Sequence, residues 1–413
     1  MPFQHLEAVL AEARPMAEAF DEAGRRLYLV GGIVRELWLD AAIDADTDLD
    51  LTTDATPQET KMIIKPLASA LWLQGERFGT VGATIDGRAY ETTTHRVERY
   101  FADSRKPQVE FATAIKEDLS RRDFTINAMA IEIATGEIID PFEGIADLGS
   151  RRLRTPLDPE ISLADDPLRM MRAARFVAGL DLEPDLSLVE AMSALADRLD
   201  IVSAERIGVE FDKLLALPDP AAGVRLLDQT GLLGLFLPEA AGAAMDRSID
   251  RLSDLPDGPE LRLAALLFET TPSAAAARIG ALRHSAARRR WTATVLETAQ
   301  RLARGEVCDP ASMRRWVARS QGTVEPARGI VANLAPQGEE LVAASVVLER
   351  GLGAELDDLG PALTGQQVMD ALDLPPGAAV GEALDFLQEL RFDEGPLEPD
   401  EATTRLKAWW GQR

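Results

Sequence analysis

The 413-residue sequence is poor in the residues that form disulfides and soft metal sites. It has one cysteine, Cys308, which excludes a disulfide framework and any zinc site built on cysteines. Its three histidines, His5, His95 and His284, are too scattered along the chain to form a ligand cluster. These absences exclude a disulfide-stapled secreted protein and a cysteine- or histidine-based zinc protein.

The sequence also lacks long apolar runs. None approaches the length needed to cross a bilayer, and the first 20 residues lack the cationic start and apolar core of a signal peptide. We therefore expect a cytoplasmic protein. A hydrophobic content of 46% over this length favours a large core and two or more domains. The formal net charge of −25 repels a polyanion at long range, so binding of nucleic acid requires local basic faces.

An apolar run, a glycine pair and an arginine form the first informative stretch. Residues 27–30 (LYLV) predict a buried strand, which breaks at Gly31-Gly32 into a predicted helix. Paired glycines let backbone amides approach an anion, and Arg35 supplies a planar cationic fork. Taken alone, the glycine pair is explained as well by an ordinary tight turn.

An acidic stretch follows, in which Leu49 and Leu51 alternate with Asp48 and Asp50. This period of two predicts a strand with both carboxylates on one face. Adjacent carboxylates repel each other unless a cation lies between them, and oxygen ligands suit Mg²⁺. The alternative is a solvated acidic edge strand. With the glycine turn upstream, the pattern favours metal-assisted nucleotidyl transfer.

The dipeptide Asp86-Gly87 between two alternating segments predicts a β-hairpin. The hairpin places Glu91 on a strand that can neighbour the acidic strand. Glu91 is therefore a candidate third metal ligand, with a structural cross-strand acid as the equal alternative. Residues 97–115 are charged and interrupted by Pro107, which predicts a mobile loop.

Two later motifs carry arginines beside carboxylates. Arg122 and Asp123 precede an apolar segment, and we interpret them as contacts to phosphate and to sugar hydroxyls, with a structural salt-bridge network as the alternative. After about residue 156, helical periodicity replaces the strand pattern. There, four polar residues recur at every third position and so share one side of a helix, which is either functional or solvated: Asp166, Arg169, Arg172 and Arg175.

In this order, the motifs resemble the class II tRNA nucleotidyltransferases and poly(A) polymerases of bacteria. Ile33 and Glu36 stand where the family usually has a small residue and Asp, and Asp165 stands where it usually has Glu. The resemblance is strong over residues 27–215 and weak beyond. It rests on residues 29–36 (LVGGIVRE), 48–50 (DLD), 53–57 (TDATP), 117–129 (EDLSRRDFTINAM) and 165–176 (DDPLRMMRAARF).

The resemblance implies an α+β protein. A nucleotidyltransferase head with a small mixed β-sheet and helices is expected at residues 1–155. A helical neck that recognises the base is expected at 156–225, and an all-α body and tail that bind tRNA at 226–413. No membrane or protein partner is implied.

The resemblance also implies roles for the polar residues. Asp48 and Asp50 are the expected catalytic residues and Mg²⁺ ligands. Asp166 and Arg169 are expected to imitate the edge of a base, because a carboxylate accepts from the exocyclic amine of C or A and a guanidinium donates to the ring. The other expected nucleotide-binding residues are Gly32, Arg35, Arg122, Asp123, Arg172 and Arg175.

The predicted function is Mg²⁺-dependent addition of CCA to the 3′ end of tRNA from CTP and ATP, with release of pyrophosphate. A poly(A) polymerase or A-only enzyme of the same family is the first alternative, although Gly79-Thr80-Val81 favours CCA addition. A silent RNA-binding paralogue is the second, and the intact acidic pair argues against it. Two basic runs, residues 283–290 and 314–315, are candidate contacts to tRNA phosphate or solvated helix faces.

Overall fold

The structure is a computed structural model that describes residues 4–41, 43, 49–72, 79–101, 104–239 and 243–412. Asp48, one of the two predicted catalytic carboxylates, lies outside the described residues. The chain divides into two compact units, Met1–Phe236 and Leu237–Arg413. Within the described ranges, no helix is both long enough and apolar enough to cross a bilayer.

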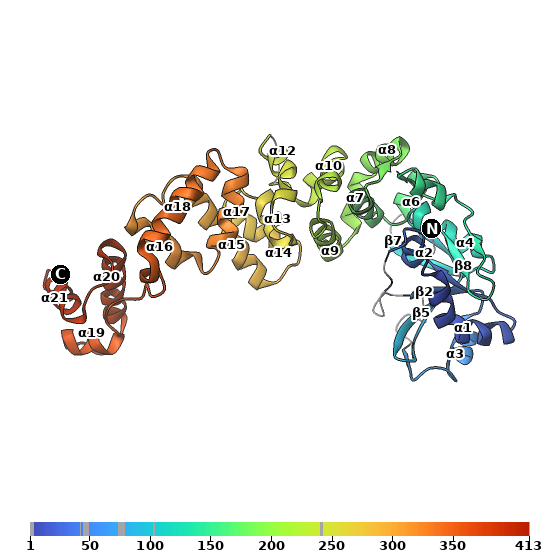
Figure 1. The fold of residues 1–413 in the computed structure, drawn as a ribbon, viewed down its shortest axis with the longest axis horizontal. Helices are drawn as coiled ribbons and strands as arrows, with labels where there is room; N and C mark the ends of the chain where they lie inside the picture. Colours follow the sequence, from blue (N-terminus) through green and yellow to red (C-terminus); the bar gives the residue numbers. More distant parts are fainter. Residues whose placement is uncertain are drawn as a thin grey trace. The chain divides into compact units, whose positions relative to one another are not determined.

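The first unit contains a seven-stranded mixed sheet (Figure 1). The strands lie in the order β3-β4-β5-β2-β1-β8-β9, and β2 pairs in parallel with β5 but antiparallel with β1. The strand bounds are β1 Leu27–Val30, β2 Leu49–Thr53, β3 Ala70–Trp72, β4 Thr80–Ile85, β5 Arg88–Thr94, β8 Ala130–Glu132 and β9 Ile138–Ile139.

The burial of the two central strands follows from their sequences. All four residues of β1 are buried, and in β2 the exposed Asp50 lies between the buried Leu49 and Leu51. Helices α1 (Leu6–Glu22) and α3 (Pro57–Ile64) pack against the sheet. On another part of the sheet, Tyr28 of β1 packs with Leu119 of α4 (Ile115–Ser120).

The sequence predicted a hairpin turn and a mobile loop in the first unit, and the structure describes the hairpin and most of the loop region. The hairpin at Asp86-Gly87 is confirmed, because both residues have positive φ and join the antiparallel strands β4 and β5. The predicted loop at residues 97–115 is wrong over most of its length, since β6 (Arg96–Phe101) and β7 (Ser104–Phe111) form an antiparallel pair there. Pro107 is compatible with this pair, because both strands of a two-stranded sheet are edges.

The rest of the first unit is mainly helical. Strands β10 (Arg152–Leu153) and β11 (Glu183–Pro184) form a small parallel pair among the helices. The helices are α2 Gly32–Trp38, η2 Thr125–Asn127, α5 Gly144–Gly149, α6 Pro159–Asp165, α7 Leu168–Leu180, α8 Leu186–Ala194, η3 Ala196–Ile201, α9 Ala204–Leu215, α10 Ala221–Gln229 and α11 Leu232–Phe236.

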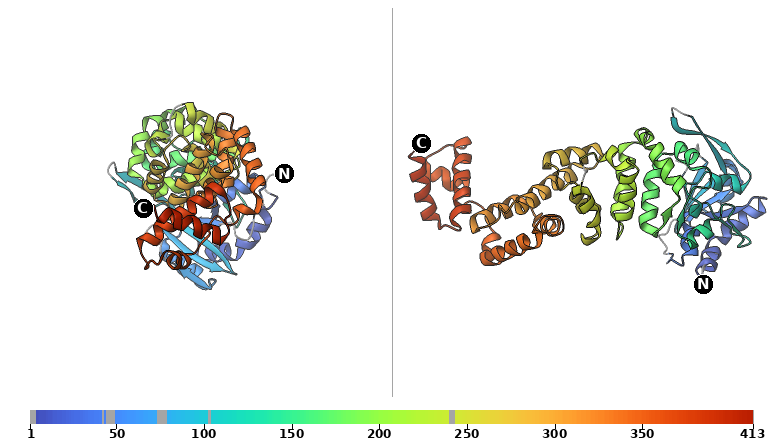
Figure 2. Two further views of the ribbon diagram at one scale, coloured as in Figure 1. Left: turned by 90° about the vertical axis from the view of Figure 1, so that its left-hand side faces the viewer. Right: turned by 90° about the horizontal axis from the view of Figure 1, so that it is seen from above.

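The described part of the second unit consists of helices and turns without a strand (yellow to red in Figure 2). Its last three helices share a separate core around Val368, Leu387 and Leu406. The α+β fold class is confirmed, whereas the three-part domain division stays a prediction. The helices are α12 Ala243–Asp250, η4 Leu252–Asp254, α13 Pro259–Leu266, α14 Pro272–Ala281, α15 Ala286–Ala303, α16 Pro310–Ser320, α17 Val324–Leu334, α18 Gly338–Leu352, η5 Gly353–Leu356, α19 Gly365–Leu372, α20 Ala378–Glu394 and α21 Pro399–Trp410.

Candidate active site

Asp50 and Glu91 lie side by side on neighbouring strands. The parallel register of β2 and β5 pairs Asp50 with Glu91, and both residues are exposed. Their neighbours Leu49, Leu51 and Tyr90 are buried. Because paired residues of adjacent strands project to the same face, the two carboxylates share one face of the sheet. The predicted adjacency of the hairpin and the acidic strand is therefore confirmed.

The turn between β1 and α2 meets this acidic face. Gly31 has φ +78°, a conformation that favours glycine. A Cβ atom at Gly31 would lie 2.9 Å from Arg122 Nη1 and 3.6 Å from Asp50 Oδ2. The structure thus brings the glycine turn, one guanidinium and one catalytic candidate together from three separate stretches of the sequence.

Arg35 is directed into the protein. One terminal nitrogen donates to Asn127 Oδ1, and the other lies 3.1 Å from Glu36 Oε1. Burial lowers the pKa of the Arg35 guanidinium in spite of the nearby carboxylates of Glu36 and Asp123. Arg35 therefore fixes the first turn of α2 to the segment around Asn127.

Asp123 is held by an arginine of α7. Its Oδ2 accepts from Arg172 Nε at 2.8 Å and Nη2 at 2.6 Å, and its Oδ1 accepts from Asn127 Nδ2 at 3.0 Å. Burial alone would raise the pKa of Asp123, but Arg172 and Asn127 outweigh burial and lower it. Asp123 is therefore a charged, buried residue that links η2 to α7, as in the salt-bridge alternative; its contact with sugar stays a prediction.

The two residues predicted to read the base lie close to the start of α7. Asp166 Oδ1 accepts from the Leu168 backbone at 3.2 Å, and Asp166 Oδ2 lies 3.7 Å from Arg206. Arg169 is buried and donates to Ser162 Oγ at 2.6 Å and to the backbone oxygen of Arg121. The arginine thus connects α6 to the Arg121-Arg122 pair.

Three arginines, one from α2 and two from α7, lie around one aromatic ring. The guanidinium carbons of Arg35, Arg172 and Arg175 lie 5.3, 5.5 and 4.6 Å from the centre of the Phe176 ring. Arg175 Nε also donates to Glu210 Oε2 at 3.0 Å. Glu210 was not singled out from the sequence, although a glutamate buried on an amphipathic helix requires a cationic partner.

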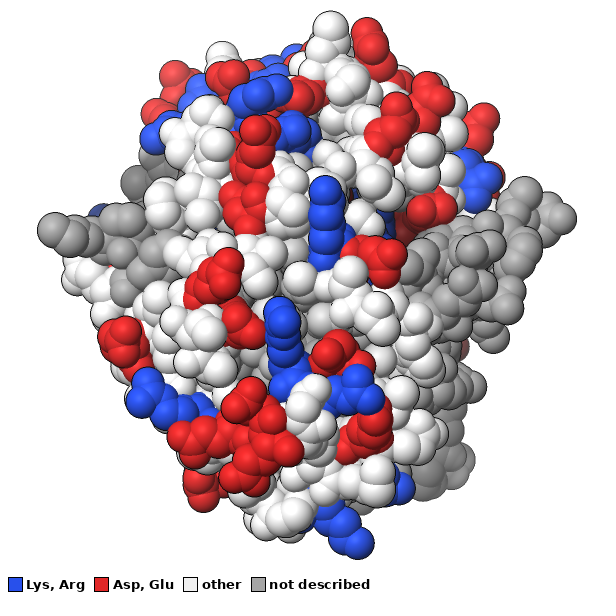
Figure 3. All heavy atoms as spheres, turned by 90° about the vertical axis from the view of Figure 1, so that its right-hand side faces the viewer, with Lys and Arg blue, Asp and Glu red and all other residues white. Residues whose placement is uncertain are grey.

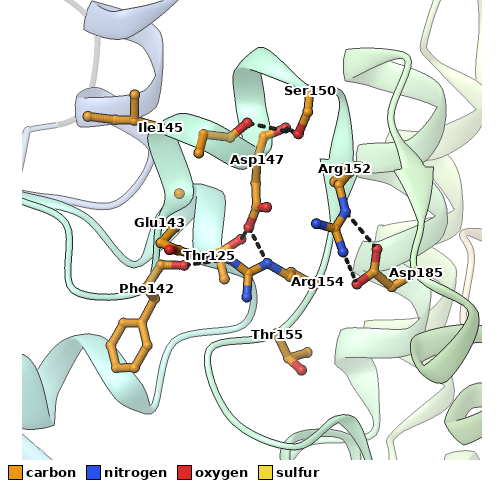
Figure 4. A network of polar contacts seen from close by, with 12 residues as sticks. Thr125, Phe142, Glu143, Ile145, Asp147, Ser150, Arg152, Arg154, Thr155 and Asp185 are labelled. Carbon is orange, nitrogen blue, oxygen red and sulfur yellow. Dashed lines mark hydrogen bonds and ion pairs between the residues drawn. The ribbon is translucent and has the colours of Figure 1, made fainter.

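A second buried carboxylate holds the chain next to η2 (Figure 4). Asp147 Oδ2 accepts from Thr125 Oγ1 at 2.6 Å and from Arg154 Nε at 2.7 Å. Arg154 Nη2 continues to the backbone oxygen of Phe142 at 3.0 Å and to Glu143. This network fixes the position of η2 relative to β10.

Asp50 and Glu91 occupy adjacent positions on the acidic face, whereas Asp48 lies outside the description. Within that description, no group of three or more histidine, cysteine, aspartate or glutamate residues is arranged to hold a metal. Figure 3 shows acidic and basic side chains intermixed over one face of the molecule.

In the second unit, the two basic runs differ. Arg283 lies between α14 and α15, and Arg289 and Arg290 lie near the start of α15. All three are exposed, and their side chains form no hydrogen bond or ion pair with the described residues. Arg314 is buried, with Glu355 at 2.6 Å, and Arg315 bonds Glu389 at 2.9 Å. Three arginines of the first run are thus available to an external anion, whereas both arginines of the second run are used within the fold.

The fold is that of a nucleotidyltransferase head followed by a helical body. Residues 27–154 match the family model of the poly(A) polymerase head domain. Residues 179–243 match the model described as the probable RNA and SrmB-binding site of polymerase A. The chain belongs to the family of class II tRNA nucleotidyltransferases and poly(A) polymerases.

Curated relatives of the chain are named CCA-adding enzymes. That of Limosilactobacillus reuteri is 39% identical over 250 residues, which cover 59% of this chain and 60% of the relative. That of Levilactobacillus brevis is 38% identical over 273 residues, or 66% of each protein. The chain thus matches about 60 to 66% of the length of these relatives.

Solved structures of the same name resemble the chain over nearly its whole length. The Bacillus stearothermophilus CCA-adding enzyme in complex with CTP has a TM-score of 0.74 and 27% identity, and the match covers 98% of each chain. The Thermotoga maritima CCA-adding enzyme complexed with tRNA has a TM-score of 0.71 and 20% identity, over 98% of this chain and 96% of that one. The second match is a likeness of fold alone.

Proposed function

We propose that this protein adds C, C and A to the 3′ end of tRNA from CTP and ATP and releases pyrophosphate. One observation carries the proposal: Asp50, Glu91, the Gly31 turn and Arg122 meet on one face of the sheet. The names of the curated relatives support CCA addition over the synthesis of a poly(A) tail. The predicted cytoplasmic location belongs to the same proposal, because tRNA and both nucleotides are available there.

The acidic face fits Mg²⁺. Asp50 and Glu91 offer exposed carboxylate oxygens at adjacent positions, and Asp48 is predicted to share their face through the two-residue period of the strand. Magnesium held there would activate the 3′-hydroxyl of the tRNA and neutralise charge on the departing pyrophosphate. The role of Glu91 as a ligand is part of this proposal.

The chain's own task is to position the triphosphate. Gly31 and Gly32 leave the backbone open to close approach, and Arg122 offers its guanidinium to phosphate oxygens at that turn. Arg35 is bonded to Asn127 and Glu36, so we assign it to holding the turn as well as to the nucleotide. Arg172 is paired with Asp123, and Arg175 is paired with Glu210. These ion pairs support a role for both arginines in positioning the side chains of the nucleotide site.

Selection of the base is assigned to Asp166 and Arg169. Asp166 accepts from the exocyclic amine that C and A both present, and that U lacks. A guanidinium has five N–H donors, and the three bonds of Arg169 to Ser162 and Arg121 leave two for the base. A single pair of residues thus accepts CTP and ATP.

Binding of tRNA is assigned in part to the exposed arginines of the second unit. Arg283, Arg289 and Arg290 provide a local cationic surface on a chain whose net charge is −25. Phosphate contacts need such local cations, whereas the acidic remainder of the surface disfavours indiscriminate binding of nucleic acid.

The test is incorporation on a tRNA transcript that ends at the base preceding CCA. Labelled CTP, labelled ATP and both together are offered with Mg²⁺. The proposal predicts two C additions with CTP alone and a complete CCA with both nucleotides, followed by arrest. An open-ended A tail without CTP would assign the chain to poly(A) synthesis, and the absence of any product would favour a silent RNA-binding protein.

A further inference from the structure

Asp118 carries a negative charge in the interior of the first unit. Its side chain in α4 is fully buried, and its main partners are two arginines. Oδ1 accepts from Arg121 Nε at 3.0 Å and Nη2 at 2.8 Å, while Oδ2 lies 3.4 Å from Arg122 Nη2. The Arg96 backbone N–H, 3.4 Å away, also donates to Oδ1.

This carboxylate stays ionised. Burial alone would raise the pKa of Asp118, but the charges of Arg121 and Arg122 outweigh burial and lower it. Because the side chain is sealed from solvent, Asp118 acts on a nucleotide only through the groups that it holds.

Those groups lead to both ends of the proposed nucleotide site. Arg122 Nη1 reaches the Gly31 turn, where the triphosphate is placed. The backbone oxygen of Arg121 accepts a hydrogen bond from Arg169, the arginine assigned to the base. One buried carboxylate therefore fixes the segment that connects phosphate binding to base selection.

We propose that Asp118 is a positioning residue for nucleotide binding, which holds the Arg122 guanidinium at the Gly31 turn. The proposal rests on the proposed function, because Arg122 is a nucleotide ligand only within it. Asp118 differs from a structural ion pair in one testable respect. Its removal raises the KM for nucleotides, and it does so through Arg122.

The chain offers a matched control in Asp147. This aspartate is also buried in the first unit, 2% exposed, and is paired with Arg154 at 2.7 Å. Its arginine continues to Phe142 and Glu143 instead of the glycine turn (Figure 4). Asp147→Asn thus removes an equivalent buried charge without releasing Arg122.

The experiment compares Asp118→Asn with Asp147→Asn in the full chain. With saturating tRNA, we expect D118N to raise the KM for both CTP and ATP about tenfold and to change kcat less than about threefold, because a charged contact that orients a ligand group has been lost. We expect D118N and D147N to lower the melting temperature by similar amounts. D147N should leave both KM values within about twofold of those of the unmodified protein. Equal KM changes in the two variants would reduce Asp118 to a structural role.

A double-mutant cycle with Arg122→Ala tests the connection itself. If Asp118 acts through Arg122, D118N changes KM by less than about twofold when Arg122 is already alanine. If the effects of D118N and R122A on the nucleotide KM multiplied in the double variant, the proposal would be overturned and the proposed function would stay in place. An unchanged KM in R122A alone would instead overturn the triphosphate assignment on which the inference depends.

A further variant covers the case in which D118N does not fold at the assay temperature. Arg122→Lys keeps the positive charge but lacks the planar fork that reaches both Asp118 and the Gly31 turn. We expect a rise in nucleotide KM in R122K at an unchanged melting temperature. A nucleotide KM equal to that of the unmodified protein would show that the position of the guanidinium is unimportant.

Discussion

Two sets of arginines, one in each unit, are used in opposite ways. In the first unit, Arg35, Arg169 and Arg172 are largely or partly buried, and each is bonded to a named acceptor. In the second unit, Arg283 and Arg290 are exposed and form no bond with the described residues. Preorganised arginines suit a small ligand read by geometry, whereas exposed ones suit a polyanion held by charge. The two units should therefore respond differently to mutation and to salt.

The largest effect is expected on the acidic face of the first unit. Asp50→Ala should lower the rate of nucleotide incorporation by roughly a thousandfold or more, because transfer depends on positioned charge at the transferred phosphate. The exposed side chain contributes little to packing, so the melting temperature should stay nearly the same. Single-turnover incorporation and thermal unfolding measure the two quantities. Retention of full activity would remove the metal site from this face.

The next largest effect is expected on the choice of nucleotide, and it separates base selection from the rate of incorporation. Asp166→Ala should reduce the preference for CTP and ATP over UTP and GTP by about tenfold or more, because the acceptor for the exocyclic amine is lost. The rate with the correct nucleotide should fall less than the preference. Competition between pairs of nucleotides in one reaction measures the ratio. A preference that survives the change would assign base selection to other residues.

An intermediate effect is expected in the second unit. Changing Arg283, Arg289 and Arg290 together to Gln should weaken tRNA binding about tenfold near physiological salt, because each lost phosphate contact costs affinity. The slope of log Kd against log salt should decrease by up to about 3, and nucleotide KM should not change.

Arg319→Gln is the matched control for that triple variant. Arg319 has a similarly exposed side chain, but it is paired with Glu389 at 3.4 Å within the fold. We expect the salt slope of R319Q to equal that of the unmodified protein. Equal slopes in the triple variant and R319Q would contradict the assignment of Arg283, Arg289 and Arg290 to tRNA.

The smallest effect concerns a buried group that is neutral. Burial lowers the pKa of His95 below 6.5, in spite of the nearby Asp118. In the unfolded chain, His95 therefore binds a proton near pH 6.5, whereas in the folded chain it binds one only at lower pH. The free energy of unfolding falls as the pH decreases below 6.5. Urea unfolding at pH 7.5 and 5.5 should show this loss, and His95→Gln should reduce it. A pH dependence unchanged in H95Q would assign the effect to other groups.

Much of the fold was predictable because its signals are local. The alternation around Asp50, the break at Gly31 and the turn at Asp86-Gly87 each follow from the preferences of a few adjacent residues. The pair β6 and β7 was missed, because a strand with charge and a proline is stabilised by a partner that local periodicity does not reveal.

The contacts that hold the candidate site residues together were not predictable from local sequence. Residues far apart in sequence meet at the Gly31 turn, and their order along the chain indicated this meeting only through the family resemblance. The pairing of Asp118 with two arginines was not identified, because a buried carboxylate looks the same as an exposed one in a sequence. For the same reason, the exposed Arg290 and the paired Arg315 were indistinguishable before the structure.

The most direct test of the division between the units is photoaffinity labelling with 8-azido-ATP. After irradiation with and without excess CTP, the labelled peptides are identified by mass spectrometry. The account predicts that the label lies between Gly31 and Arg175 and that CTP prevents it, because one site accepts both nucleotides. Label confined to residues 237–413, or label in the first unit that CTP leaves unchanged, would contradict the account.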